Sequence, residues 1–183
     1  MHNREIAMGP YSKRISTFLF FKDQAEQAVR FYTSVFDNSS IVSISRYSEN
    51  EMKALSRLPE ESRPGPAGTV KVIKFILDGN EYYAGNGGPY FSFSQAISLY
   101  VRCRTQDEID YFWEKLSEGG EKEVCGWLKD RFGVSWQVAP AQLDDWLADP
   151  DTEKSSRVSI AVYDSKKLDI EVLRKAYEGA ASA

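Results

Sequence analysis

The sequence predicts an α+β fold made of two similar halves. The main observation is a repeat, in which an apolar, β-rich segment is followed by an amphipathic helix and further strands, beginning at residue 15 and again at residue 97. A second observation is Asp78-Gly79-Asn80, which lies between two apolar runs and is typical of a hairpin turn. The 183 residues suit one domain, or two halves that share a core.

The first half begins with residues 15–21 (ISTFLFF), which are typical of a buried strand. Asp23 and Glu26 have the spacing of a capping box and predict that a helix starts there. Six apolar residues behind them recur at helical spacing and form one face: Ala25, Ala28, Val29, Tyr32, Val35 and Phe36. The alternation over residues 41–47 predicts the next strand.

Residues 48–68 are polar and contain several prolines and glycines, so we expect a short helix followed by a mobile loop. Strands over residues 70–77 and 81–84 flank the hairpin turn. We interpret Asp78 and Glu81 as surface residues of this hairpin.

The stretch AGNGGPYFSFSQAI, at residues 84–97, is rich in glycine and aromatic residues. A cofactor-binding glycine turn lies between a strand and a helix, whereas Pro89 and a β-rich aromatic run follow these glycines. We therefore expect the stretch to turn the chain toward the second half and not to cradle a phosphate. Its glycines allow backbone conformations that are closed to residues with a Cβ.

The second half repeats the pattern. The apolar residues between Ile97 and Cys103 alternate as in a strand, and Thr105 and Glu108 form a second capping-box pattern. The helix that follows has one apolar stripe, made of Ile109, Phe112, Trp113 and Leu116. We expect this helix to end at the glycine pair at residues 119–120.

Two short strands, over residues 124–129 and 134–138, complete the second half. Asp130 begins the turn between them, and we expect its side chain to accept hydrogen bonds from the backbone N–H groups ahead of it. Residues 154–178 are typical of two short helices. We divide the chain accordingly into a flexible leader (1–14), a main domain (15–153) and a C-terminal helical tail (154–183).

The composition argues against several classes of function. The formal net charge is -4 and no cluster of Lys and Arg occurs, so a nucleic-acid partner is not expected. No apolar run approaches the roughly 20 residues that a membrane helix needs, and the leader lacks the apolar stretch of a signal peptide. Cys103 and Cys125 are the only cysteines and form no CxxC pair, which is typical of reduced thiols in a cytoplasmic protein.

Three stretches carry a resemblance to a known family: FLFFKDQAEQAVRFYTSVF (18–36), GNGGPYFSF (85–93) and CGWLKDRFGVSWQVAP (125–140). They resemble the PhnB-like branch of the vicinal oxygen chelate (glyoxalase/bleomycin resistance/dioxygenase) superfamily, whose members are also labelled 3-demethylubiquinone-9 3-methyltransferase-like. The resemblance implies two βαβββ modules, over residues 15–90 and 91–140, that form a curved mixed sheet around a pocket. It also implies a homodimer.

Many members of this superfamily bind a divalent metal through His and Glu side chains on inward-facing strands. At the matching positions this chain has Ser16, Ser98 and Gln137, and its only histidine is His2, in the leader. Because hydroxyl and amide groups are poor ligands for such a metal, we expect neither a metal nor another cofactor. The methyltransferase label would imply S-adenosylmethionine, but the glycine stretch lacks the strand–turn–helix context of such a site.

We expect a pocket lined by aromatic side chains with a few polar anchors. The candidate binding residues are Phe18, Phe20, Asn86, Tyr90, Phe93, Cys125, Trp127, Trp136 and Gln137. About half of the strand aromatics should face the core instead, because successive side chains of a strand point to opposite faces. A nucleophilic role for Cys125 would need Lys129 or Asp130 as its base, and we favour packing in a tight strand.

The leading hypothesis is a metal-free PhnB-like protein that binds a small, aromatic or amphipathic molecule in an apolar pocket. One alternative is an enzyme, either the methyltransferase of the family label or a metal-assisted lyase or dioxygenase. Another alternative is a dimeric scaffold whose pocket is filled by its own aromatic side chains. The partners expected are therefore a small molecule and a second copy of the chain.

Overall fold

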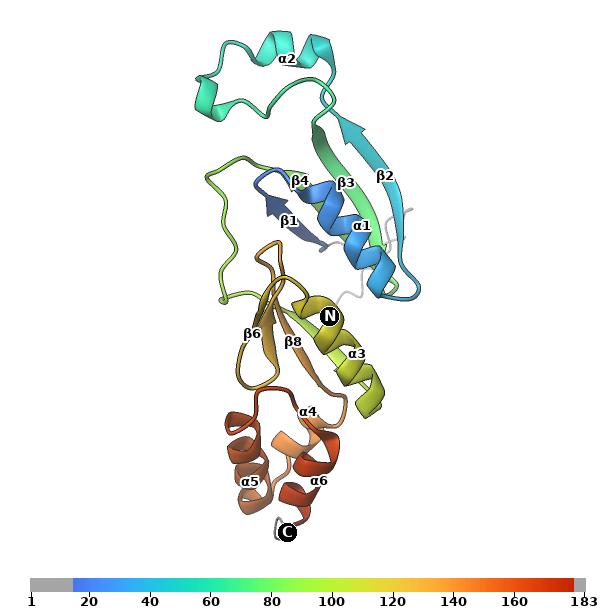
Figure 1. The fold of residues 1–183 in the computed structure, drawn as a ribbon, viewed down its shortest axis with the longest axis vertical. Helices are drawn as coiled ribbons and strands as arrows, with labels where there is room; N and C mark the ends of the chain where they lie inside the picture. The colour runs from blue at the N-terminus through green and yellow to red at the C-terminus, as the bar shows by residue number, and fades with distance from the viewer. Residues whose placement is uncertain (1–14, 180–183) are drawn as a thin grey trace, which may run out of the picture. The chain divides into compact units, whose positions relative to one another are not determined.

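A computed structural model describes residues 15–179 of the chain. The predicted leader at residues 1–14, with His2, lies outside the described residues. The chain divides into two compact units, residues 1–91 and 92–183, and each contains a four-stranded sheet with helices (Figure 1). Both units have the order βαβββ, with additional helices, so the predicted α+β fold of two modules is confirmed.

Unit 1 builds its sheet from strands that are far apart in the chain. Its elements are β1 (Thr17–Phe21), α1 (Ala25–Val35), β2 (Ser40–Arg46), α2 (Glu49–Leu55), a 3-10 turn (Glu60–Ser62), β3 (Val70–Leu77) and β4 (Asn80–Asn86). The strand order is β1-β4-β3-β2, in which β1 is parallel to β4 and the other pairs are antiparallel. The carboxyl ends of β1, β2 and β4 therefore lie at one edge of the sheet.

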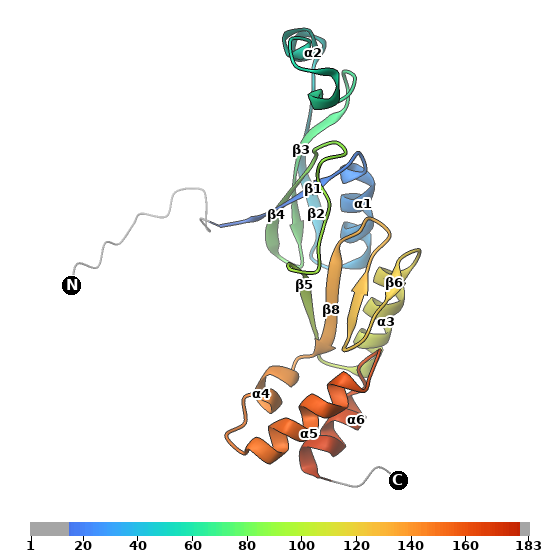
Figure 2. The ribbon, with the colours of Figure 1, turned by 90° about the vertical axis from the view of Figure 1, so that its left-hand side faces the viewer.

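Helix α1 covers one face of this sheet (Figure 2). All six residues of its predicted apolar face are buried, as are the inward-facing side chains of β1 and β3: Leu19, Phe21, Ile73 and Phe75. Each large side chain buried in this way stabilises the fold by about 1.5–3 kcal/mol relative to exposure. Strand alternation leaves Phe18 and Phe20 on the opposite, open face of the sheet.

Helix α1 begins differently from the prediction. No side chain at its N-cap accepts a hydrogen bond from the first turn. Instead, Asn86 Oδ1, at the end of β4, accepts the N–H of Ala25 at 2.9 Å, and Glu26 binds two arginines rather than the backbone. The predicted capping box at Asp23 is therefore wrong, because Asn86, 61 positions after Ala25, supplies the acceptor.

The segment between β2 and β3 is tied to the sheet at both ends. Tyr47 N–H donates to Thr69 O at 3.0 Å, directly after β2. Ser48 and Glu51 form a complete capping box at the start of α2. Glu51 also binds Lys71 of β3 at 2.6 Å, and this hydrogen bond is the main reason that its pKa falls to about 2.

The predicted hairpin between β3 and β4 is confirmed. Leu77 pairs with Asn80, and the two residues between them, Asp78 and Gly79, have φ angles of 46° and 72°. Positive values at both positions are those of a type I′ turn, which matches the twist of the two strands. A Cβ at Gly79 would lie 2.8 Å from Asn38 Nδ2, so glycine also provides the space that this contact needs.

Unit 2 repeats the arrangement and adds helices at its end. Its elements are β5 (Leu99–Cys103), α3 (Gln106–Ser117), β6 (Glu121–Lys122), β7 (Trp127–Lys129), β8 (Ser135–Pro140), α4 (Leu143–Leu147), α5 (Thr152–Tyr163) and α6 (Ile170–Glu178). The strand order is β5-β8-β7-β6, with β5 parallel to β8. Strand β6 was not predicted, because two charged residues carry no apolar alternation.

Two local predictions in unit 2 are confirmed. Thr105 Oγ1 accepts the N–H of Glu108 at 3.2 Å and caps α3, although the Glu108 carboxylate accepts the N–H of the residue before the cap. Asp130 Oδ1 accepts the N–H groups of Phe132 and Val134, at 2.8 and 3.0 Å. Both side chains therefore accept hydrogen bonds from backbone N–H groups that have no partner within the helix or the strand.

The two units share one detail at the edge of the sheet. In unit 1, Phe21 O at the end of β1 accepts the N–H of Gly87 at 2.7 Å. In unit 2, Cys103 O at the end of β5 accepts the N–H of Ala141, also at 2.7 Å. Each bond joins the last residue of the first strand to the residue that follows the last strand. The repeat predicted from the sequence therefore extends to the hydrogen bonds at this edge.

The C-terminal helices belong to unit 2, and their presence confirms the prediction of a helical tail. Helices α5 and α6 pack side by side (Figures 1 and 2). They share a buried apolar core with one residue of β8 and one of α4. This core consists of Ala139 (β8), Leu143 (α4), Val158 (α5), Leu168 (before α6) and Leu173 (α6). Gln106, in the first turn of α3, accepts the N–H of Ile170 at 2.9 Å and so joins α6 to the start of α3. Within residues 15–179, no helix is long and apolar enough to cross a membrane.

Candidate functional site

Unit 1 carries a row of aromatic rings on the open face of its sheet. The ring centroids of Phe18 and Phe20 are 4.6 Å apart, those of Phe20 and Phe91 are 4.9 Å apart, and Tyr83 lies 6.1 Å from Phe18. All three pairs are stacked. We call these four side chains the aromatic stack. Phe18 and Phe20 are 41% and 39% exposed, so a large apolar surface faces outward here.

The glycines of the stretch 84–97 make room for this stack. A Cβ at Gly85 would lie 3.3 Å from the ring of Phe18. At Gly87 it would lie 2.5 Å from the ring of Phe91 and 2.8 Å from that of Phe20. Distances below 3.0 Å force a ring to move, so the side chain of any other residue at position 87 would displace the stack. The glycines thus allow the rings to lie directly against the backbone.

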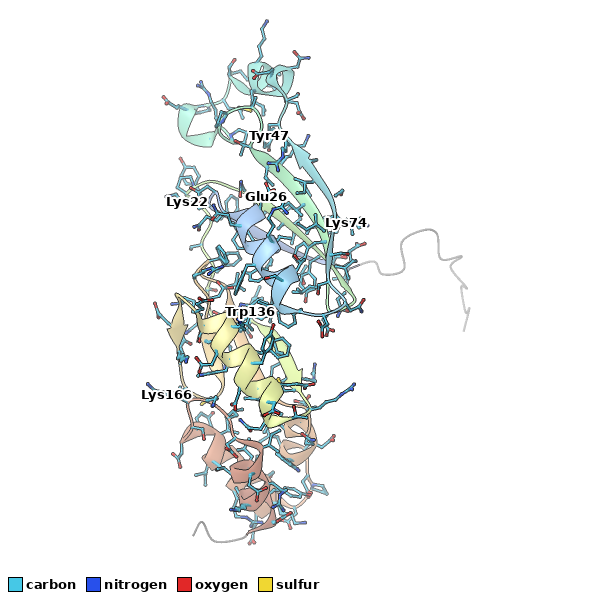
Figure 3. All side chains as sticks on the ribbon, turned by 45° about the vertical axis from the view of Figure 1, so that its right-hand side comes forward. Lys22, Glu26, Tyr47, Lys74, Trp136 and Lys166 are labelled. Atoms are coloured by element: carbon cyan, nitrogen blue, oxygen red, sulfur yellow. The ribbon has the colours of Figure 1, made fainter. Side chains whose placement is uncertain are left out.

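A small polar cluster lies beside the stack on the same face. Glu81 accepts hydrogen bonds from Ser16 and Tyr83, both at 3.2 Å, and pairs with Lys74 at 2.7 Å. The Lys74 hydrogen bond lowers the pKa of Glu81, and Glu81 in turn raises the pKa of Lys74. Glu81 lies at the surface of the hairpin, as expected, with 28% of its side chain exposed, and its hydrogen bonds and ion pair also make it the centre of this cluster. Figure 3 shows Lys74 on this sheet.

A second feature of unit 1 is a cavity of about 630 Å³ at the start of α1. It is lined by residues from the ends of β1, β2 and β4, from the first two turns of α1, and from the segment before β3. We call it the basic cavity, because four of its lining residues are Lys22, Arg30, Arg46 and Arg63. Two carboxylates, Asp23 and Glu26, also line it. Figure 3 shows Lys22 and Glu26 near the start of α1.

The structure distributes the nine predicted binding residues over the two units. Phe18 and Phe20 meet in the aromatic stack, whereas Asn86 caps α1 and lines the basic cavity. Tyr90 is 64% exposed in the segment after β4. Phe93, in unit 2, lies beside Gly133, where an added Cβ would be 3.7 Å from its ring.

The remaining four predicted residues lie in unit 2. Trp127 and Gln137 are cross-strand neighbours on β7 and β8, and Gln137 Nε2 donates to Ser98 Oγ at 2.8 Å. Trp136 is 1% exposed and donates to Asp130 Oδ2 at 2.8 Å, so it offers no surface to a ligand within this unit. Cys125 N–H donates to Ser165 O at 2.7 Å, which holds the turn between α5 and α6.

The positions that match metal ligands do not fit a metal. Ser98 and Gln137 are bonded to each other, and Ser16 is bonded to a carboxylate that already pairs with Lys74. Among residues 15–179, no three His, Cys, Asp or Glu side chains gather where they could hold an ion. A hydroxyl, an amide and one lysine-paired carboxylate lack the donor charge that a catalytic divalent ion needs.

Sequence reasoning missed the basic cavity. Its four cations come from three segments, namely the start of α1, the end of β2 and the stretch before β3, and Arg63 lies in the stretch expected to be a mobile loop. One local signal was present, since Lys22, Glu26 and Arg30 stand at intervals of four, which places the last two on one side of α1. Nothing local connects Arg46 or Arg63 to that helix.

The sequence matches, over residues 13–139, the family described as 3-demethylubiquinone-9 3-methyltransferase. The chain belongs to this family. A solved structure from Bacillus cereus, named 3-demethylubiquinone-9 3-methyltransferase, PhnB protein, is 41% identical, with 70% of this chain and 100% of that chain covered and a TM-score of 0.60. The PhnB-like resemblance and the glyoxalase-type fold are therefore confirmed.

More distant solved structures also match. A Staphylococcus aureus protein is 29% identical, with 70% of this chain and 97% of that chain covered and a TM-score of 0.30. Protein PA1353 from Pseudomonas aeruginosa is 20% identical, with coverages of 68% and 95% and a TM-score of 0.49. No curated protein matches the sequence. The family match ends at residue 139, so α4, α5 and α6 extend beyond the part shared with the family.

Proposed function

We propose that this member of the family is a binding protein that takes up a flat, aromatic small molecule against the aromatic stack of unit 1, without a metal. The observation that carries the proposal is the exposure of Phe18 and Phe20, about two-fifths each, in a row of four stacked rings. A flat ligand would extend this row, and each stacked pair stabilises a complex by about 0.5–1.5 kcal/mol beyond the burial of its area.

The polar cluster beside the stack would orient such a ligand. Lys74 lies 5.8 Å from the centroid of the Tyr83 ring and pairs with Glu81, so a cation, a carboxylate and a phenol gather near the Phe18 ring. An apolar surface with a few polar groups at one end is the usual composition of a small-molecule site. A ligand with one flat ring and one hydrogen-bonding substituent, such as a quinone, fits this composition.

Titration with a soluble naphthoquinone, followed by NMR, tests the proposal. We expect the amides of β1 and β4 to shift, and the Phe20→Leu variant to bind roughly three- to tenfold more weakly because one stacked pair is lost. Tyr111→Leu is the matched control, since Tyr111 is 42% exposed on α3 in unit 2. Equal binding by wild type and Phe20→Leu, or an equal loss in both variants, would refute the proposal.

The alternative function and two parts of the proposal, the homodimer and the absence of metal, each have a separate test. The family name favours an enzyme as the alternative, and a thermal shift with S-adenosylmethionine well above that of a nucleotide control would support it. Native mass spectrometry would report the mass of the assembly, for which we propose a homodimer. Elemental analysis that finds a stoichiometric transition metal would overturn the metal-free part.

A further inference from the structure

We propose that the basic cavity of unit 1 is a binding site for a small organic dianion, that is, a phosphate monoester or a dicarboxylate. This site is separate from the aromatic stack and does not depend on the function proposed for it. The two features meet at the glycine stretch, where Gly87 contacts the rings and the next two residues line the cavity.

The charges of the cavity are not balanced. Four cationic side chains face two carboxylates, a formal excess of two positive charges in a chain whose net charge is -4. Glu26 is shared, since it pairs with Arg30 at 2.7 Å and with Arg46 at 2.6 Å. One carboxylate thus pairs with two guanidinium groups, which leaves a net charge of about +1 on these three side chains.

Among the described side chains, two further cations have no carboxylate partner. The guanidinium group of Arg63 donates to the backbone carbonyl groups of Leu58, at 2.9 Å, and Ser56, at 2.8 Å. Lys22 forms no ion pair with a described side chain. The carbonyl groups hold the Arg63 guanidinium in place without neutralising it, as suits a group that receives an anionic oxygen.

Hydrogen bonds hold the walls of the cavity in place. Arg46 Nη1 donates to Gly68 O at 3.2 Å, and Gly68 N–H donates to Tyr47 O at 2.8 Å, so the segment before β3 is tied to the end of β2. On the opposite side, Asn86 uses its Oδ1 to cap α1, which leaves the amide hydrogens on Nδ2 as donors.

The size of the cavity is compatible with a small molecule, and its charge favours a dianion. A volume of about 630 Å³ lies within the range of roughly 300–1,000 Å³ that is usual for small-molecule sites. An excess of two positive charges matches a dianion, and phosphate and carboxylate groups both offer the paired oxygens that a guanidinium group binds. A nucleic acid would need a longer basic surface than these four side chains provide.

Calorimetric titration of the full chain at low salt, with glycerol 3-phosphate, succinate and neutral glycerol as probes, tests the site. We expect at least one dianion to bind, glycerol not to bind, and added salt to weaken binding. Arg63→Gln and Lys22→Gln should each weaken it about tenfold, the effect of losing one charge-assisted hydrogen bond. Arg57→Gln is the matched control, because it removes an exposed arginine of the same unit that does not line the cavity.

One variant is expected to bind more tightly. Asp23 lines the cavity with a negative charge, so Asp23→Asn should strengthen dianion binding severalfold. Damage to the fold cannot produce this result, which keeps the test independent of the stability of Arg63→Gln. Preference for glycerol 3-phosphate or for succinate identifies the ligand class. Absence of binding by both, or an equal loss in Arg57→Gln, would overturn the proposal.

Discussion

The two units have the same backbone order but differ at the edge where their first helix begins. In unit 1 this edge holds the basic cavity, with Asn86 from β4 as the cap of α1. In unit 2 the equivalent edge is covered, because Gln106 of α3 binds the start of α6 and Lys167 pairs with Asp110 at 2.6 Å. In both units, the last residue of the first strand (β1 or β5) accepts a hydrogen bond from the residue that follows the last strand.

The difference shows that this edge is not determined by the βαβββ backbone. The N–H groups of a helix start and the ends of three strands gather there in either unit, and the chain that follows decides whether they are covered. In unit 2 the cover is α4–α6, which lie beyond the part of the chain that matches the family. In unit 1 the segment between β2 and β3 forms a wall and leaves a space.

The largest effect should come from opening the covered edge. Leu168 is fully buried in the C-terminal core and would lie 3.1 Å from a Cβ at Gly126. Leu168→Ala should lower the free energy of unfolding by about 2–5 kcal/mol through loss of burial and a residual cavity. Denaturant melts measure this. Leu147→Ala, at a site that is 42% exposed, is the control and should cost less than about 1 kcal/mol. Equal losses would mean that α6 does not seal this edge.

A second test uses the two thiols. Cys103 holds the position of Phe21 in the repeat and is fully buried, and burial raises its pKa to about 12. Cys125 is only half-buried. Alkylation of the folded protein should therefore modify Cys125 first, with Cys103 slower by at least about a hundredfold, because the thiolate is the reacting form. Mass spectrometry of peptides produced by cleavage after Glu follows both sites, since trypsin would leave Cys103 in a dipeptide. Comparable rates of alkylation at Cys103 and Cys125 would show that the folded protein does not protect the end of β5.

The N-terminal caps of α1 and α3 can be compared by a matched pair of substitutions. Asn86→Ala removes the acceptor for α1 and Thr105→Ala the acceptor for α3. Each should lower the free energy of unfolding by about 1 kcal/mol, since one N–H group of the first helical turn loses its side-chain acceptor in either case. Equal values from urea melts would show that a distant cap is as effective as a local one. A negligible loss for Asn86→Ala would place the cap of α1 elsewhere.

The smallest expected effect is a dependence on pH. Hydrogen bonds from Arg30 first, and then Arg46, hold the pKa of Glu26 below its ordinary value of 4.5. Glu26 therefore adds stability above that value and loses it as the pH falls through the lowered pKa. The loss should stay below about 1 kcal/mol, because both arginines are well exposed.

Comparison of wild type with Glu26→Gln, near neutral pH and in acid below the lowered pKa of Glu26, measures this contribution. The difference in free energy of unfolding should be present at neutral pH and absent in acid. Lys167 lowers the pKa of Asp110 in unit 2 in the same way, so Asp110→Asn should follow the same course. If the difference in free energy of unfolding between wild type and variant grew as the pH fell, it would contradict the predicted sign for Glu26 or for Asp110.

Local patterns predicted the fold well. The apolar face of α1, the Asp78-Gly79 turn and the Asp130 turn depend on residues within a few positions of one another, and all three are confirmed. The capping box at Asp23 failed for the opposite reason. The acceptor is Asn86, and only the pairing of β1 with β4 brings it to the helix.

The site was less predictable than the fold. The rings of Phe18 and Phe20 were expected at a site, but the reason for Gly85 and Gly87 became visible only with the rings in place. The basic cavity depends on charges from separate segments, and periodicity within one element cannot connect them. Trp136 is among the predicted binding residues, but β8 places its side chain in the core.

The segment between β2 and β3 has a further consequence for how such a wall can be added to a fold. Ser16 and Glu81 are joined across 65 positions of chain, whereas Ser98 and Gln137 are joined across 39. The entropy of closing a loop grows only with the logarithm of its length, by about 0.6 kcal/mol per doubling. Since 65 is less than twice 39, the longer closure in unit 1 adds less than about 0.6 kcal/mol of closure entropy. The length of the added segment is therefore a small part of its cost, and its contacts with the sheet have to offset mainly the ordering of its own backbone.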